Sequence, residues 1–183
     1  MASDVLVAYA TKHGSTREVA EVVAEELHAE LRELGEVDDL DGYRVVVIGA
    51  PLYMGRWHSD ARRFLKRHGA ELPFAVFALG PLHDTEDETR AARKQLDKAL
   101  AAFPELRPVS VAVFGGVVDP ATLHFPLSRM PASDARDWNA IRAWARGLGG
   151  ALGERDGDRA GVTVADDGEL DLVPGLVPVD QGA

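Results

Sequence analysis

The 183-residue chain contains no cysteine, and this absence excludes three kinds of chemistry at once. Without thiols there is no disulfide framework, no thiolate metal site and no cysteine nucleophile. The six histidines are scattered without the H-E-x-x-H spacing of a zinc helix, so no metal site is predicted. Long apolar runs are also missing, because VLVAYA and VVVIGAPLYMG are far shorter than the ~20 residues of a membrane-spanning helix.

The chain also lacks a basic surplus and a leader pattern. Its net charge of −10 argues against nucleic-acid binding as the main role. No positively charged start precedes an apolar stretch, so no signal peptide is expected. We therefore expect a cytoplasmic protein and leave peripheral contact with a membrane open.

Composition divides the chain into two parts. Hydrophobic residues make up 46% and charged residues 27%, as in a globular protein with a real core. Residues 154–183 hold eight acidic and two basic side chains, which leaves residues 1–153 with a net charge of only −4. We predict one domain at residues 1–152 and an acidic tail at 153–183. The tail is either disordered or a hairpin around Asp167 and Gly168.

Short apolar segments alternate with helical patterns along the predicted domain. Strands are predicted at residues 3–10, 36–40, 43–51, 72–80 and 107–116, of which 36–40 is the weakest. Helices are predicted at residues 15–34, 59–69, 85–103 and 133–148. Ser15 with Glu18, and Thr85 with Glu88, have the spacing of capping boxes. This order predicts an α/β fold with a parallel sheet covered by helices on both faces.

A site is expected where the strands of such a sheet end. Ligands of open parallel sheets bind beyond the carboxyl ends of the strands. The loops that leave those ends are residues 11–16, 51–58, 80–85 and 115–132. We therefore expect these loops to form one site.

The first of these loops, TKHGST, has the features of an anion site. It opens a helix, whose first backbone N–H groups are unpaired and attract negative charge. Thr11, Ser15 and Thr16 add hydroxyls that suit a phosphate, although a plain strand-to-helix turn would also fit. The G-x-x-x-x-G-K-[ST] pattern of triphosphate loops and the G-x-G-x-x-G pattern of dinucleotide loops are both absent.

Two stretches carry a resemblance to a known family. Residues 11–16, with the spacing Thr-x-x-Gly-x-Thr, resemble the phosphate loop of flavodoxins, which holds the phosphate of flavin mononucleotide (FMN). Residues 48–68 are similar to the matching stretch of flavodoxin-like menaquinone-dependent protoporphyrinogen dehydrogenases, which has a glycine flanked by aromatics and then His-Ser, here Tyr53, Gly55, Trp57, His58 and Ser59. AVFGG at residues 112–116 and the helix after it also look like that family. The resemblance covers roughly residues 4–150.

The resemblance implies a fold, a cofactor and an activity. The fold would be a flavodoxin-like three-layer α/β/α sandwich whose five-stranded parallel sheet has the order 2-1-3-4-5. The activity would be that of an FMN-dependent oxidoreductase, passing electrons from a porphyrinogen-like donor through the flavin to a quinone or another acceptor. The implied cofactor-binding residues are Thr11, Lys12, His13, Gly14, Ser15, Thr16, Pro51, Leu52, Tyr53, Met54, Gly55, Trp57, Gly80, Pro81, Leu82, His83, Gly115 and Gly116.

The second loop suits the flat, apolar ring of a flavin. Tyr53 and Trp57 are candidates to stack on it, and Gly55 allows close approach of the backbone or positive φ. Trp57 has a second interpretation as a cover for the next helix. Met54 is interpreted as packing.

The other two loops depart from the family. In flavodoxins the third loop often offers an aromatic residue, whereas here it offers only Leu82 and His83. One ring face would then stay open, which fits a carrier and an enzyme equally. The fourth loop has Leu123, Phe125, Leu127 and Met130 but only one arginine, where the dehydrogenases carry a longer, basic insertion. It is interpreted either as a pocket lid or as ordinary packing, and the quinone partner does not follow from it.

Basic residues gather in the expected loops. A rim predicted at Lys12, Arg56 and Arg62 would attract an anionic substrate or redox partner, with His13 and His83 nearby. Arg63 is interpreted as part of a solvated helix face. His58 is a candidate proton donor, since its unperturbed pKa of ~6.5 suits proton transfer, and a structural role is the alternative.

Three other functions share parts of this pattern. A flavodoxin-type electron carrier fits the same residues. A flavin-free binding or regulatory domain is the second, because His13 occupies a position where flavodoxins often have a second threonine. A signalling receiver domain is excluded, because residues 8–11 and 49–51 at the strand ends contain no acid. The oligomeric state stays open.

Overall fold

The computed structural model describes residues 3–53, 55–83, 85–122, 125 and 127–160. Its parallel sheet has the strand order β2-β1-β3-β5-β6. These strands are β1 (Val5–Tyr9), β2 (Glu30–Glu33), β3 (Val45–Tyr53), β5 (Phe74–Leu79) and β6 (Ser110–Phe114). The predicted order 2-1-3-4-5 is confirmed, since β5 and β6 are the fourth and fifth parallel strands.

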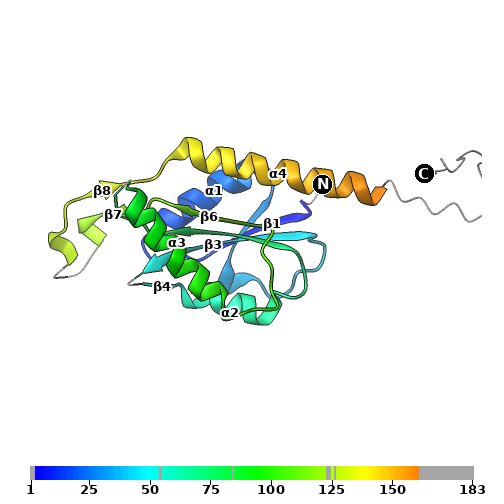
Figure 1. The fold of residues 1–183 in the computed structure, drawn as a ribbon, viewed down its shortest axis with the longest axis horizontal. Coiled ribbons are helices and arrows are strands. Elements are labelled where there is room, and N and C mark those ends of the chain that lie inside the picture. Colours follow the sequence, from blue (N-terminus) through cyan, green and yellow to red (C-terminus); the bar gives the residue numbers. More distant parts are fainter. Residues whose placement is uncertain (1–2, 54, 84, 123–124, 126, 161–183) are drawn as a thin grey trace, which may run out of the picture.

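Helices cover both faces of the sheet, as Figure 1 shows. They are α1 (Ser15–Leu27), α2 (Ser59–His68), α3 (Glu86–Leu100) and α4 (Trp138–Ala160). The side chains of α1 and α4 pack in one buried cluster, and those of α2 and α3 pack in the other. The three-layer α/β/α sandwich is therefore confirmed.

Shorter elements lie around the carboxyl end of the sheet. Strand β4 (Arg56–Trp57) turns back on the end of β3 as an antiparallel hairpin. Strands β7 (Val117–Val118) and β8 (Ser133–Asp134) form a separate antiparallel ribbon. Figure 1 shows this ribbon beyond the end of the sheet, and the segment between its two strands contains short 3-10 turns at Pro120–Thr122 and Leu127–Arg129.

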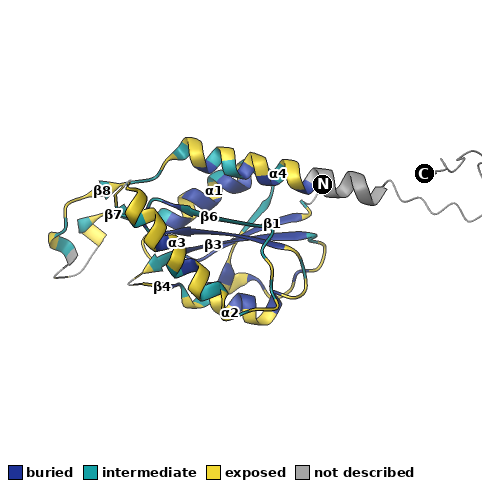
Figure 2. Cartoon of the chain, viewed as in Figure 1, coloured by how far each residue is buried: buried dark blue, intermediate teal, exposed yellow. Residues whose placement is uncertain are grey.

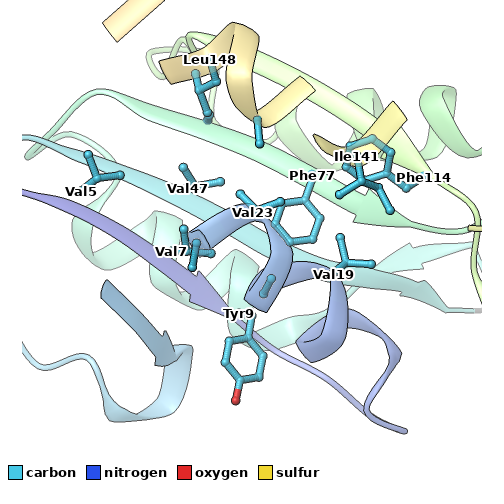
Figure 3. Close-up of a cluster of buried hydrophobic side chains, with 14 of the residues drawn as sticks. Val5, Val7, Tyr9, Val19, Val23, Val47, Phe77, Phe114, Ile141 and Leu148 are labelled. Carbon is cyan, nitrogen blue, oxygen red and sulfur yellow. The ribbon is translucent and has the colours of Figure 1, made fainter. Parts of the chain in front are cut away.

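The sheet is buried on both faces, which explains its nearly continuous apolar strands. Every residue of β1 and β5 is buried, as the dark blue centre of Figure 2 shows. In Figure 3, Val23 from α1 and Ile141 from α4 lie beside Phe77 of β5. Burying each such side chain stabilises the fold by about 1.5–3 kcal/mol.

The predicted second strand and the end of the first helix are wrong. Helix α1 ends at Leu27, because His28 adopts a left-handed conformation with φ of 50° and donates its N–H to the carbonyls of Ala24 and Glu25. The second strand is Glu30–Glu33 rather than residues 36–40. Leu31 and Leu34 have the spacing of residues on one face of a helix, which is why the helix was predicted to continue through them. In the structure they pack in the two clusters on opposite faces of the sheet.

The last helix also differs from its prediction. It begins at Trp138, where the Asp137 carboxylate accepts the N–H groups of Asn139 and Ala140, and it runs through Gly149 and Gly150 to Ala160. The two glycines do not end it, because each costs only about 1 kcal/mol within a helix. The hairpin predicted around Asp167 lies outside the described residues. No helix in the described ranges is both long enough and apolar enough to cross a membrane.

Candidate functional site

A cleft of about 800 Å³ lies at the carboxyl ends of β1, β3, β5 and β6. All four loops expected to form one site contribute to its wall. The predicted cofactor residues that line it are Lys12, His13, Ser15, Thr16, Pro51, Leu52, Tyr53, Gly55, Gly80, Pro81, Leu82 and Gly116. Its size is in the range of small-molecule and cofactor pockets.

The first loop is built to leave backbone donors at the start of α1. Gly14 is the N-cap residue and has a φ of 92°, which glycine adopts without strain. Its N–H donates to Thr11 Oγ1 at 2.9 Å, and its carbonyl accepts the N–H of Glu18 at 3.1 Å. The capping box expected at Ser15 is wrong, because no side chain caps this helix. The first-turn N–H groups therefore keep the partial positive charge of a helix N-terminus.

Thr16 adds a polar group to this end of the cleft. The residue is fully buried and lines the cleft, and its Oγ1 atom has no hydrogen-bond partner in the described part of the chain. An unsatisfied buried hydroxyl costs about 1–3 kcal/mol. A buried, unpaired hydroxyl beside a helix N-terminus fits a site that accepts the oxygens of an anion.

Lys12 and Tyr53 join the first loop to the second. The Lys12 ammonium lies 3.9 Å from the centre of the Tyr53 ring, and both side chains are exposed at the cleft. At exposed sites such a cation–π contact stabilises by about 0.5–1 kcal/mol. The two residues form one wall that offers an aromatic face and a positive charge.

Trp57 does not face the cleft. Its side chain is 2% exposed and packs in the core with Ala61, Phe64 and Leu96, and its indole N–H donates to the Ala50 carbonyl at 3.3 Å. The stacking role predicted for Trp57 is therefore corrected. It anchors the β3–β4 hairpin on α2, while Gly55, with a φ of 75°, makes the turn.

His58 has a structural partner as well as a place in the cleft wall. It is the N-cap residue of α2, and its Nδ1 accepts the backbone N–H of Asp60 at 3.3 Å. In the neutral ring this bond leaves the proton on Nε2. The imidazole thus caps a helix, and its proposed part in proton transfer rests on the other nitrogen.

The third loop is held by Glu88 of α3. The N–H groups of Leu82 and His83 donate to Glu88 Oε2 at 2.9 and 3.0 Å, and His83 Nδ1 lies 2.8 Å from Oε1. The bond from the His83 side chain, then those from the backbone, lower the pKa of the Glu88 carboxyl. Thr85 caps α3 by accepting the Glu88 N–H at 3.4 Å, so only half of the predicted capping box forms.

One wall of the cleft was not predicted from the sequence. It comes from a single face of α3, with Glu88, Ala91, Ala92 and Gln95. Their spacing of three, four and seven residues was visible, but it contains no aromatic or catalytic signal. Leu79, Val117, Val118 and Met130 complete the lining.

The remaining predicted residues lie around the cleft without lining it. Thr11 and Gly14 shape the first turn, and His83 is exposed beside Glu88. Gly115 is required for close approach, since a Cβ there would lie 1.8 Å from the Ala135 carbonyl oxygen. Met54 lies outside the described residues.

The predicted basic rim is split between the cleft and its surroundings. Lys12 lines the cleft, whereas Arg56 and Arg62 are exposed outside the lining. Within the described ranges Arg56 and Arg62 have no ion-pair partner, in contrast to Arg63, which pairs with Asp60 at 3.2 Å.

The fourth loop reaches the cleft at only part of its length. Met130 lines the cleft, while Phe125 is 72% exposed with the Arg129 guanidinium 5.0 Å from its ring centre. Leu123 lies outside the described residues, and Leu127 is described only as part of a 3-10 turn. Within the part of this loop that the structure describes, Gly116, Val117 and Val118 line the cleft beside Met130.

The fold and the cleft define a doubly wound α/β protein with a cleft at the strand ends and the N-terminus of α1 at one side of it. The sequence profile of the flavodoxin domain family matches residues 6–129. The chain belongs to the flavodoxin family.

Individual relatives agree with this assignment. The chain is 30% identical over 127 residues to protoporphyrinogen IX dehydrogenase [quinone] of Escherichia coli K12, an alignment that covers 62% of this chain and 68% of the relative. A flavodoxin, WrbA-like protein of Agrobacterium tumefaciens superposes with a TM-score of 0.52 at 14% identity, covering 82% of this chain and 97% of that one. Oxidised flavodoxin 2 of Bacillus cereus superposes with a TM-score of 0.50 at 17% identity, covering 84% and 99%. These superpositions confirm the flavodoxin-like fold.

Proposed function

We propose that the chain binds FMN and acts as an FMN-dependent oxidoreductase. One observation carries this proposal: two features occur together at one site. The first is the start of α1, with its unpaired N–H groups and the buried hydroxyl of Thr16, and the second is an apolar cleft of about 800 Å³. A flavin mononucleotide has the matching two ends, a phosphate and a flat ring. Family membership supports the same cofactor.

Different parts of the cleft would hold the two ends of the cofactor. The backbone N–H groups of Ser15 and Thr16, together with their hydroxyls, would bind the phosphate. Leu52, Tyr53 and Pro81 offer apolar and aromatic surface for the ring, and exclude water from it. When bound, FMN supplies the electron transfer that no side chain here performs, and the protein binds, orients and tunes it.

The reaction we propose resembles that of the Escherichia coli relative. Electrons would pass from a porphyrinogen-like donor through the flavin to a quinone or another acceptor, as the name of that relative implies. The exposed cations Lys12, Arg56 and Arg62 would attract an anionic substrate to the cleft. A simple electron carrier is the second candidate, and the absence of an aromatic in the Gly80–His83 loop favours it as much as an enzyme.

The first test is flavin binding. We expect the purified protein to be yellow or to bind added FMN, and Thr16→Val to weaken FMN binding about tenfold because one hydrogen bond to a charged phosphate is worth about 1.5–3 kcal/mol. Thr89→Val on the exposed face of α3 is the matched control and should bind FMN normally. Fluorescence quenching of FMN measures both affinities. A colourless protein that ignores added FMN would favour a flavin-free regulatory domain.

The second test separates an enzyme from a carrier. The flavin-loaded protein should oxidise protoporphyrinogen IX with a soluble menaquinone analogue as acceptor. Absence of turnover, together with full reduction and reoxidation of the flavin by small dyes, would support the carrier.

A further inference from the structure

The cleft is electrically asymmetric. At one end lie Lys12 and the N-terminus of α1, both of which favour negative charge. In the wall formed by α3 lies Glu88, the sole carboxylate among the described residues that line the cleft. A ligand that enters with an anionic end therefore has its other end near a negative charge.

Glu88 also fixes the Gly80–His83 loop, which lies beside it in the cleft wall. Its Oε2 accepts two backbone N–H groups, those of Leu82 and His83, and its Oε1 contacts the His83 imidazole. Hydrogen bonds to an ionised carboxylate are about twice as strong as neutral ones. The other side of the loop is tied to β6 and the residues after it, because Gly80 donates to Phe114 and Gly116 donates to Pro81.

These bonds leave the loop poor in donors. The two N–H groups that the loop could turn toward a ligand are both taken by Glu88, while Pro81 has no N–H at all. Leu82 and Pro81 face the cleft as apolar surface. The backbone of this loop therefore offers no free hydrogen-bond donor to an anionic atom, and the charged residue that α3 adds to the lining, Glu88, is negative.

We propose that Glu88 is a positioning and specificity residue, which latches the Gly80–His83 loop and disfavours negative charge on the part of the ligand that lies against it. This inference rests on the proposed function, in which the ligand is FMN. Oxidised FMN has a neutral ring. Beside the Glu88 carboxylate an anionic, two-electron-reduced ring would be less stable than the neutral oxidised ring, so Glu88 would favour binding of the oxidised form.

The first experiment tests the latch in the protein without flavin. Hydrogen exchange is measured at the backbone N–H groups of Leu82 and His83 in the wild type, Glu88→Ala and Glu88→Gln. We expect Glu88→Ala to raise exchange at both groups by at least tenfold, and Glu88→Gln to raise it less because one oxygen acceptor remains. Equal exchange in Glu88→Ala and the wild type would overturn the latch.

The second experiment tests the charge effect. The affinities of oxidised and reduced FMN are compared in Glu88→Gln and in Glu86→Gln, a control on the same helix turn whose side chain is 96% exposed and outside the cleft. We expect the ratio of the oxidised to the reduced dissociation constant to rise about tenfold in Glu88→Gln, which corresponds to a two-electron potential about 30 mV more positive. Glu86→Gln should leave the ratio unchanged.

The outcomes separate this inference from the proposed function. If FMN does not bind to the wild type, the proposed function fails, and the exchange measurement still decides whether the latch exists. If FMN binds and Glu88→Gln has the potential of Glu86→Gln, the charge effect is refuted while the proposed function stands.

Discussion

Single backbone positions carry much of this site. Gly14 starts α1 with a φ of 92°, and Gly115 leaves room for the Ala135 carbonyl. Neither glycine has a side chain that could contact a ligand. A Cβ at Gly14 would meet no atom within 4 Å, so Gly14 is required for its positive φ and not for lack of room. The geometry of the helix start therefore depends on a residue that tolerates the left-handed region.

Gly14→Ala tests this dependence. We expect the free energy of unfolding to fall by about 1–2 kcal/mol, because an L-residue in the left-handed region is strained. Gly35→Ala is the matched control, since Gly35 is exposed, has no atom within 4 Å of its Cβ position and no positive φ. There we expect a gain of about 0.4–1 kcal/mol from the reduced entropy of the unfolded chain. Urea unfolding of both variants measures the difference, and equal losses would contradict the assigned strain.

At the same scale, the sequence allowed most polar residues of the cleft to be predicted but not their partners. Thr16, Lys12 and Tyr53 were predicted because hydroxyl, basic and aromatic types follow strand ends. Trp57 was misplaced because an aromatic residue beside a glycine turn suits a ligand and a core equally, and burial decides between them. Glu88 was assigned to a capping box, whereas its carboxylate holds a loop several residues before it in the chain.

At the scale of elements, hydrophobic periodicity predicted the buried strands correctly. It predicted the wrong element where the helical spacing of α1 continues by chance into the strand β2. Leu27, Leu31 and Leu34 continue the spacing of α1, so the helix was predicted to extend to residue 34. The left-handed turn at His28 interrupts it, and a non-glycine residue gives no sequence signal for such a turn. The start of α4 was displaced in the same way, because Ser133 belongs to the ribbon β7–β8, whose pairing no local pattern records.

Helices α1 and α4 are tied by ion pairs at Glu26, and their strength should depend on pH. Glu26 accepts bonds from Arg146 at 2.8 Å and from Arg142 at 2.8 Å, and these two bonds, that of Arg146 first, lower the pKa of its carboxyl. A carboxyl with a lowered folded-state pKa stabilises the fold above its unfolded pKa of about 4.3, and this contribution is lost as the pH falls through the folded value.

Glu26→Gln should therefore lower the thermal midpoint at pH 7. The difference from the wild type should begin to shrink as the pH falls through the unfolded pKa of about 4.3 and should vanish below the lowered folded-state pKa. Thermal unfolding followed by circular dichroism at a series of pH values measures it. Glu21→Gln removes a more exposed pair with Arg17 on the same helix and should have a smaller effect. A difference that persists unchanged into acid would assign the loss to packing instead of charge.

At the scale of the whole molecule, two electrostatic effects oppose each other. The chain carries a net charge of −10, which would repel the proposed anionic substrate at long range. Arg56 and Arg62 are exposed and have no ion-pair partners in the described part of the chain, so they would attract it close to the cleft. The Debye length is about 10 Å at 0.1 M salt, so the distant charges are screened first and the near ones dominate. No single motif shows this balance, because it depends on where the fold places each charge.

If the proposed reaction with an anionic porphyrinogen is correct, its kcat/KM should fall as salt rises from about 0.05 to 0.3 M, because this range screens the attraction of the rim as well. The double variant Arg56→Ala/Arg62→Ala should lower kcat/KM severalfold at low salt and flatten the salt dependence or reverse its sign, since the net repulsion is then no longer offset. Arg63→Ala is the control, because Arg63 is already paired with Asp60. A wild-type rate that rises with salt would show that repulsion by the whole chain outweighs the rim, and the substrate would then have to be recognised by the apolar cleft itself.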